Sequence, residues 1–132
     1  MNVEFTDNSK EVIAAMQEAA VRALEKCGMV AEGYAKRLCP VDTGNLRNSI
    51  SHKVAEDEPA AYIGTNSEYA AYVELGTGTY YSGGRKTPWN YQDAKGKWHR
   101  TSGQKAQPFL KPAVADHGQT YRNIIEDEMR GT

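Results

Sequence analysis

The feature that most constrains the fold of this chain is a long amphipathic pattern between residues 9 and 38. Apolar side chains recur there at spacings of three and four, the period of an α-helix with one buried face. Pro40 disfavours helical geometry at the residue before it, so one continuous helix should run to about Leu38. Its expected apolar stripe comprises Ile13, Met16, Ala20, Ala23, Leu24, Cys27, Ala31, Tyr34 and Leu38.

Local signals accompany this helix. Asn8 followed by Glu11 resembles a capping box, in which each side chain bonds to a backbone N–H at the helix start. Gly28 and Gly33 each cost roughly 1 kcal/mol relative to alanine, so we expect a bend or a close contact with another helix. The expected i,i+4 ion pairs on the solvent face are Glu18 with Arg22 and Glu32 with Lys36.

The two cysteines, Cys27 and Cys39, are expected to be free thiols. On one helix they would lie about 18 Å apart at 1.5 Å per residue, which is beyond the reach of a disulfide. Free thiols suit a reducing, cytoplasmic setting. His52, His99 and His117 are too scattered to form a zinc-ligand pattern.

Residues 49–65 alternate as a β-hairpin does, with a turn at Glu58–Pro59. Ile50, His52 and Val54 share one face of its first strand. A short helix should follow, and a closing helix is expected over about 112–130. The short helix is expected to be capped by Ser67 and stopped by Gly76, and Pro112 to lie in the first turn of the closing helix.

These elements predict an α+β fold in a single domain, residues 1–132. The long N-terminal helix and the C-terminal helix should flank a small antiparallel sheet, and an extended hairpin arm should occupy about 77–107. No run of about 18 apolar residues is present, so we expect no membrane span. The polar N-terminus does not resemble a secretory signal.

The arm is the most informative segment. It should contain strands around 88–92 and 96–101, joined by a turn at Asp93–Gly96. Six basic residues stand against Asp93 alone, a formal charge of +5, whereas the rest of the chain carries −6. Five of the chain's twelve aromatic residues lie here. The candidate interface residues are Tyr80, Tyr81, Arg85, Trp89, Tyr91, Trp98 and Arg100.

Aromatic and arginine side chains commonly anchor protein interfaces, which favours contact with a partner protein. Two alternatives stay open for the arm. The rings could pack the hairpin onto its own domain, or the basic and aromatic side chains could bind single-stranded nucleic acid or the phosphates of a duplex. The acidic remainder of the chain argues against tight DNA binding.

The tripeptide Asp42-Thr43-Gly44 also occurs at the catalytic site of aspartic proteases. Such an enzyme needs two carboxylates that share a proton, so a chain with one motif must dimerise. Here a helix end and Pro40 precede the tripeptide, where a protease has an apolar strand. We therefore expect Asp42 and Thr43 to cap a helical turn, Gly44 to relax it, and Leu46 and Ile50 to point inward. No catalytic, cofactor-binding or metal-binding residue is expected.

Three blocks in order carry a family resemblance: "PVDTGNLRNS" at Pro40–Ser49, "YAAYVELGT" at Tyr69–Thr77 and "PFLKPA" at Pro108–Ala113. Together they resemble the phage tail-component family, the neck or tail-completion proteins of long-tailed bacteriophages and prophages. Leu75 is a soft departure, since phenylalanine or tyrosine is as common there. The motif residues are Asp42, Gly44, Leu46, Arg47, Tyr69, Glu74, Gly76, Pro108, Phe109 and Pro112.

The resemblance implies an α+β virion protein of the tail or neck, assembled in the cytoplasm of the bacterial host. It implies no catalysis and a ring of identical subunits between the head-side connector and the tail-tube or tail-terminator protein, for which a hexamer is the usual size. DNA would be only passing cargo, and no membrane would be involved. The alternative is a homodimeric, retroviral-type aspartic protease that uses Asp42.

Overall fold

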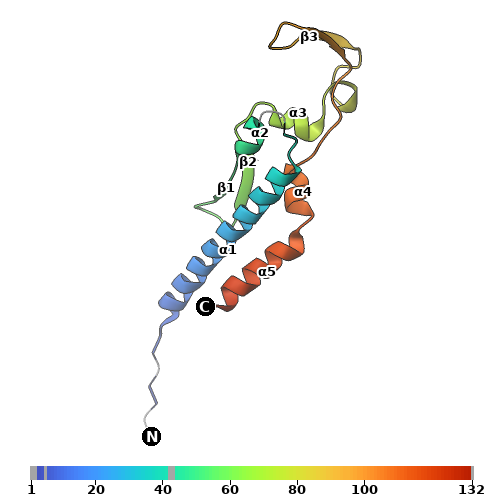
Figure 1. Cartoon of the computed structure of the whole chain (residues 1–132). Coiled ribbons are helices and arrows are strands. Elements are labelled where there is room, and N and C mark those ends of the chain that lie inside the picture. Colours follow the sequence, from blue (N-terminus) through green and yellow to red (C-terminus); the bar gives the residue numbers. More distant parts are fainter. Residues whose placement is uncertain (1–2, 5, 42–43, 132) are drawn as a thin grey trace.

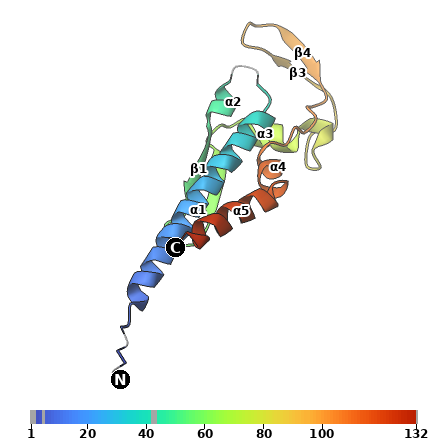
Figure 2. The same cartoon turned by 60° about the horizontal axis from the view of Figure 1, so that its bottom comes forward.

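The computed structural model describes residues 3–4, 6–41 and 44–131, and it has the predicted α+β fold. Helix α1, Ser9–Leu38, is the spine of an elongated molecule (Figure 1). Its bounds are those predicted from periodicity and Pro40. The hairpin of β1, Ile50–Val54, and β2, Ala61–Thr65, packs along one flank of α1, and α5, Gly118–Arg130, packs along another (Figure 2).

The remaining elements connect these layers to the arm. Strands β1 and β2 pair antiparallel, with His52 opposite Ile63. Strands β3 and β4 form a separate two-stranded sheet, which is the predicted arm hairpin. The other bounds are α2 Asn45–Asn48, α3 Ala70–Leu75, the 3₁₀ turn η1 Gly78–Tyr80, β3 Trp89–Gln92, β4 Trp98–Thr101 and α4 Leu110–Ala115.

The core is small and is built on alanines of α1. Phe109 is fully buried beside Ile50 and Ala113, where the sheet, α1 and α4 meet. Along α1 the buried side chains are short, which lets its neighbours approach closely. The buried stripe consists of Ala19, Ala23, Cys27, Ala31 and Ala35.

The predicted stripe of α1 was therefore partly wrong. Ala23, Cys27 and Ala31 are buried as expected, but the larger Ile13, Met16 and Leu38 are about half exposed. Periodicity identifies the helix correctly, yet it does not reveal how far along the helix its partners extend.

The closing helix is broken in two, which corrects the single helix predicted over about 112–130. Helix α4 ends at Ala115, and α5 begins at Gly118. The His117 ring between them stacks on Tyr34 of α1, with the ring centroids 3.5 Å apart. The Tyr121 hydroxyl donates to the Ala113 carbonyl across the break. The break follows from these contacts together with the weak helix propensity of Gly118.

Several local contacts of α1 also differ from expectation. Asn8 makes no side-chain cap, and the Asp7 carboxylate accepts the Ser9 N–H at 3.0 Å instead. Arg22 pairs with Glu128 of α5 and not with Glu18. The other predicted ion pair is present, because the Lys36 ammonium group lies 3.3 Å from the Glu32 carboxylate. Both cysteines are free, as expected, and both are buried.

The predicted close contact at Gly28 exists, but its neighbour is a strand residue and not a second helix. A Cβ atom at Gly28 would lie 2.7 Å from the imidazole of His52. That imidazole bonds to two carboxylates of α1, Glu25 at 2.6 Å and Glu32 at 3.1 Å. Gly33, by contrast, has nothing within 4 Å of where a Cβ would stand.

This arrangement makes stability depend on pH. The hydrogen bond to Glu25, followed by that to Glu32, raises the pKa of His52. A raised folded-state pKa adds stability that is complete below the unfolded pKa of about 6.5 and is lost as pH rises through the folded value. The urea concentration at the midpoint of unfolding should therefore decrease as the pH is raised through and above about 6.5. The variant His52→Gln should show a smaller change over this pH range, and an equal change would contradict the assignment.

Candidate functional site: the basic aromatic arm

The arm projects away from the body as a hairpin (Figures 1 and 2). Strands β3 and β4 pair antiparallel, with Tyr91 opposite His99. Asp93 builds the predicted turn, because its carboxylate accepts the backbone N–H groups of Lys95 and Lys97, each at 2.9 Å. Hydrogen bonds from the His99 imidazole and then the Lys97 amide lower the pKa of Asp93. The turn is thus a locally determined structure.

The aromatic rings of the arm do not cover the body. Exposed fractions are 67% for Trp98, 54% for Tyr80, 46% for Tyr91 and 43% for Tyr81. Trp89 is half-buried, and the guanidinium of Arg85 lies over its ring at 5.6 Å from the centroid. A cation held over an indole face is favourable where water is partly excluded. Most of the arm's aromatic surface is therefore available for contact.

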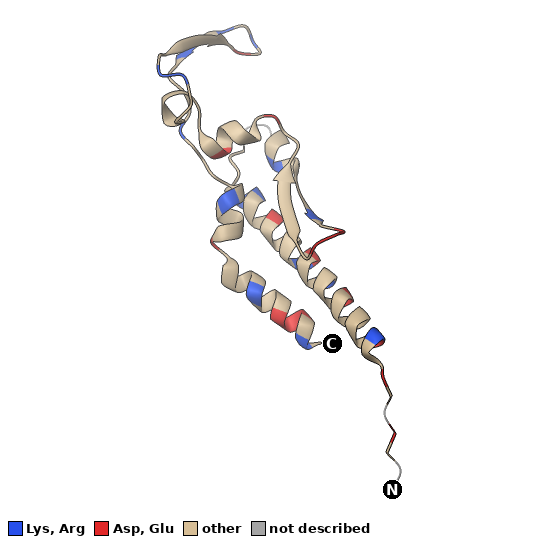
Figure 3. Ribbon diagram, turned by 180° about the vertical axis from the view of Figure 1, so that it is seen from behind, with Lys and Arg blue, Asp and Glu red and all other residues tan. Residues whose placement is uncertain are grey.

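Basic and acidic residues also differ in their distribution between the arm and the body (Figure 3). Basic side chains mark the arm, and Arg100 is exposed on β4. Acidic residues lie on the body at the β1–β2 turn, Glu56–Glu58, and in the C-terminal half of α5, Glu126–Glu128. The potential of such a molecule favours contact between the arm of one copy and an acidic surface elsewhere.

Close backbone contacts fix the base of the arm. The Thr77 N–H donates to Gln104 O and the Thr79 N–H to Ser102 O, both at 2.9 Å. The two segments approach so closely that only glycine fits. A Cβ at Gly103 would lie 2.1 Å from the Thr77 carbonyl oxygen. The sequence showed frequent glycines in this segment, but it did not show which of them are required.

Glu74 connects the two segments of the body that flank the arm in the sequence, α3 before it and α4 after it. Its carboxylate accepts three successive backbone N–H groups at the start of α4, those of Phe109, Leu110 and Lys111, at 2.7, 3.0 and 2.8 Å. These N–H groups have no partner within the helix, so an anionic acceptor stabilises the helix end. The contact links the second sequence block to the third and fixes the buried Phe109.

We expect Glu74→Ala to lower the free energy of unfolding by about 2 kcal/mol, because charge-assisted hydrogen bonds would be lost. Glu74→Gln should lose less, since its amide oxygen still accepts. Urea denaturation measures both changes. The matched control is Glu68→Ala, an exposed residue that should change stability by no more than about 0.5 kcal/mol. Equal effects of Glu68→Ala and Glu74→Ala would contradict the role of the cap.

The other residues of the three sequence blocks either shape the backbone, pack in the core or lie exposed on the surface. Gly44 and Gly76 have φ values of 85° and 83°, which favour glycine. Gly44 occupies the N-cap position of α2, while the predicted caps Asp42 and Thr43 lie outside the described residues. Ile50 is buried and Leu46 half-buried, as predicted, and Pro112 lies in the first turn of α4. Tyr69, Arg47 and Pro108 are exposed.

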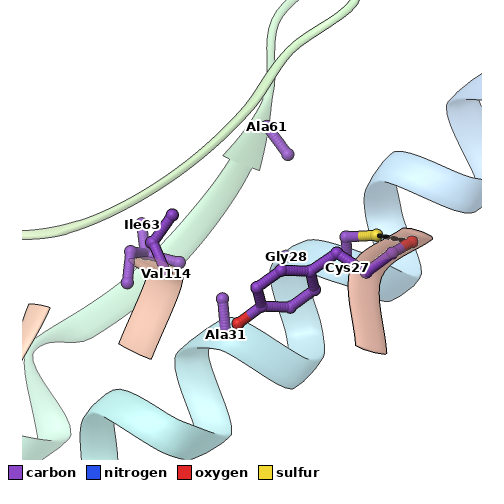
Figure 4. Close-up of a pocket in the computed structure, with 7 residues that line it drawn as sticks. Cys27, Gly28, Ala31, Ala61, Ile63 and Val114 are labelled. Carbon is purple, nitrogen blue, oxygen red and sulfur yellow. Dashed lines mark hydrogen bonds between the residues drawn. The ribbon is translucent and has the colours of Figure 1, made fainter. Parts of the chain in front are cut away.

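A small apolar pocket of about 90 Å³ lies between α1, β2, α4 and α5 (Figure 4). Ligand pockets usually measure roughly 300–1,000 Å³, so this volume fits a packing gap. At its edge the Cys27 thiol donates to the Tyr121 carbonyl at 3.7 Å. Over residues 3–4, 6–41 and 44–131, no group of His, Cys, Asp and Glu side chains could hold a metal ion. Within the same ranges no helix has the length and apolar character needed to cross a bilayer.

Comparison with known families gives a match over the N-terminal part of the chain. A family model described as "Bacteriophage HK97-gp10, putative tail-component" matches residues 4–76, more than half of the chain. The match contains the first sequence block and most of the second, and it ends before the arm and before Pro108–Ala113. No curated protein and no solved structure matches the chain.

Proposed function

The chain belongs to the HK97 gp10-like tail-component family of bacteriophages, and on that premise we propose that it joins or completes the tail at the head–tail interface without catalysis. It does so as a ring of identical subunits in the virion neck. Its partners are the neighbouring subunits, the head-side connector and the tail-tube or tail-terminator protein. DNA passes through the ring without being gripped.

The observation that carries this proposal is the exposed, basic, aromatic arm on an acidic body. Four of its rings are 43–67% exposed, and its base is tied to the body by backbone hydrogen bonds and by Glu74. An interface with another protein would bury these rings as anchors. The lysines and arginines around them would set orientation and the rate of encounter.

The small core supports assembly. Phe109 is the large side chain that is fully buried among the described residues, and alanines supply much of the rest. A chain of this size gains modest stability from such a core, and oligomerisation supplements it. The acidic body would also repel the phosphates of DNA, which suits a passage and not a binding site.

A phage or prophage that lacks this gene provides the test. Its lysate should contain DNA-filled heads and separate tails in electron micrographs. Complementation with the wild-type gene should restore joined particles, and Asp42→Asn should restore them equally, because the proposed role needs no ionisable group at this position. Virion precursors that stay uncleaved without the gene, and that are cleaved with wild type but not with Asp42→Asn, would instead establish the protease.

A further inference from the structure

The first turns of α1 extend beyond the rest of the body (Figures 1 and 2). Every residue from 9 to 18 is exposed. Three large apolar side chains lie there, Val12, Ile13 and Met16, with exposed fractions of 48%, 54% and 46%. Exposed apolar residues that cluster on one element mark an interaction surface more often than scattered ones do.

Two of these side chains continue the stripe that α1 buries against its own domain. Val12 and Met16 precede Ala19 and Ala23 at spacings of four, three and four, which places all four on one helix face. Ala19 and Ala23 are 0% and 1% exposed. The stripe thus carries alanines in the part of α1 that α5 packs against. It carries larger apolar side chains nearer the N-terminus of α1, past the end of α5.

Helix α5 ends before it can cover the larger residues. Its Glu128 pairs with Arg22 and Lys26 of α1, and the helix stops at Arg130. The face of α1 that α5 covers therefore continues past the end of α5. A further chain could extend this established interface.

A matching apolar groove lies at the opposite end of the molecule, at the base of the arm. Its volume is about 250 Å³, below the roughly 300–1,000 Å³ of a small-molecule pocket and suited to a few side chains. Tyr72, Leu75 and Tyr81 on its wall are 58%, 53% and 43% exposed. The groove is lined by Ala71, Tyr72, Leu75, Gly76, Thr77, Gly78, Tyr81 and Gly84.

The two surfaces have complementary charge. Residues 3–18 carry Glu4, Asp7, Glu11 and Glu18 against Lys10, a formal charge of −3. The chain beside the groove carries Arg85, Lys86 and Lys105, and the Lys86 ammonium group bonds to the Tyr81 carbonyl at 3.1 Å. Pairing two α1 N-termini with each other would instead bring like charges together.

We propose that the N-terminal turns of α1 in one subunit dock into the groove at the base of the arm of a second copy. Val12 and Met16 fill the groove beside Tyr72 and Leu75. Because the two surfaces lie at opposite ends of the molecule (Figure 1), the contact is head-to-tail and repeats from subunit to subunit. This inference rests on the proposed ring and assigns the contact that closes it.

Disulfide trapping tests the contact. Purified Met16→Cys and Leu75→Cys chains, one carrying a size tag, should form a disulfide-linked mixed dimer under mild oxidation, and neither variant should form one alone. Burial raises the pKa of the native Cys27 and Cys39 thiols, so these should react slowly. The matched control pairs Leu75→Cys with Met29→Cys, because Met29 is 58% exposed but lies outside the N-terminal turns. A Met16→Cys homodimer, or equal trapping through Met29→Cys, would overturn the proposal.

Charge substitution gives a second readout. Met16→Asp should abolish self-association of the wild-type chain in sedimentation, whereas Met29→Asp should preserve it. Both should keep the wild-type circular dichroism, since both positions are exposed. A wild-type chain that stays monomeric at the highest attainable concentration would also overturn the proposal. These assays use purified protein, so their failure is distinct from failure of the complementation test.

Discussion

Replacing both arm tryptophans, Trp89→Ala with Trp98→Ala, should leave the body folded and prevent tails from joining heads. The arm hairpin makes its extensive contacts within itself, between β3 and β4, and Trp98 is 67% exposed. The body should therefore keep its core around Phe109. At an interface, two aromatic anchors worth about 2 kcal/mol each would together change binding by roughly a thousand-fold.

Complementation of the gene-deficient phage measures this effect as the yield of joined particles, and circular dichroism measures the fold. The matched control is Tyr62→Ala, which removes an aromatic ring that is 55% exposed on the body. It should leave joining nearly unchanged. An unfolded double variant would show that the rings belong to the domain core, and normal assembly would show that the arm is dispensable.

The parts of the fold that local sequence determines could be predicted. Helix α1 has the expected ends because Pro40 and the apolar period act within a few residues. The arm turn at Asp93–Gly96 forms where expected because one carboxylate bonds to amides two and four residues away. The α+β class follows from these local elements.

The unpredicted parts depend on contacts between distant residues. Glu74 caps α4 from a position 35 residues before Phe109 in the sequence, and no local pattern reveals that partner. The break at His117 depends on stacking against Tyr34 of another helix. The face that α1 buries depends on where α5 ends. The candidate residues of the arm were found through composition and charge, but the supports that fix the arm were not.

The largest structural effect should come from one such support, Gly103. We expect Gly103→Ala to disrupt the base of the arm and to reduce head–tail joining as strongly as the double tryptophan variant. Gly103 has a φ of 120°, a backbone conformation that residues with a side chain rarely adopt. The added Cβ would lie 2.1 Å from the Thr77 carbonyl oxygen and 2.8 Å from Gly78 Cα. Both obstacles are backbone atoms, so no side-chain rotation relieves the clash. The segments must separate, and the arm loses its fixed direction.

Amide hydrogen exchange locates the damage, because the Thr77 and Thr79 N–H groups are bonded across this base. Their protection should fall in Gly103→Ala, while amides in the middle of α1 should stay protected. The matched control is Gly33→Ala, where a Cβ has nothing within 4 Å. That change should raise stability by up to about 1 kcal/mol, because alanine is the better helix former, and should leave joining intact. Retained protection at Thr77 and Thr79 together with normal joining in Gly103→Ala would mean that the base tolerates a side chain. Gly103 would then not be required to fix the direction of the arm.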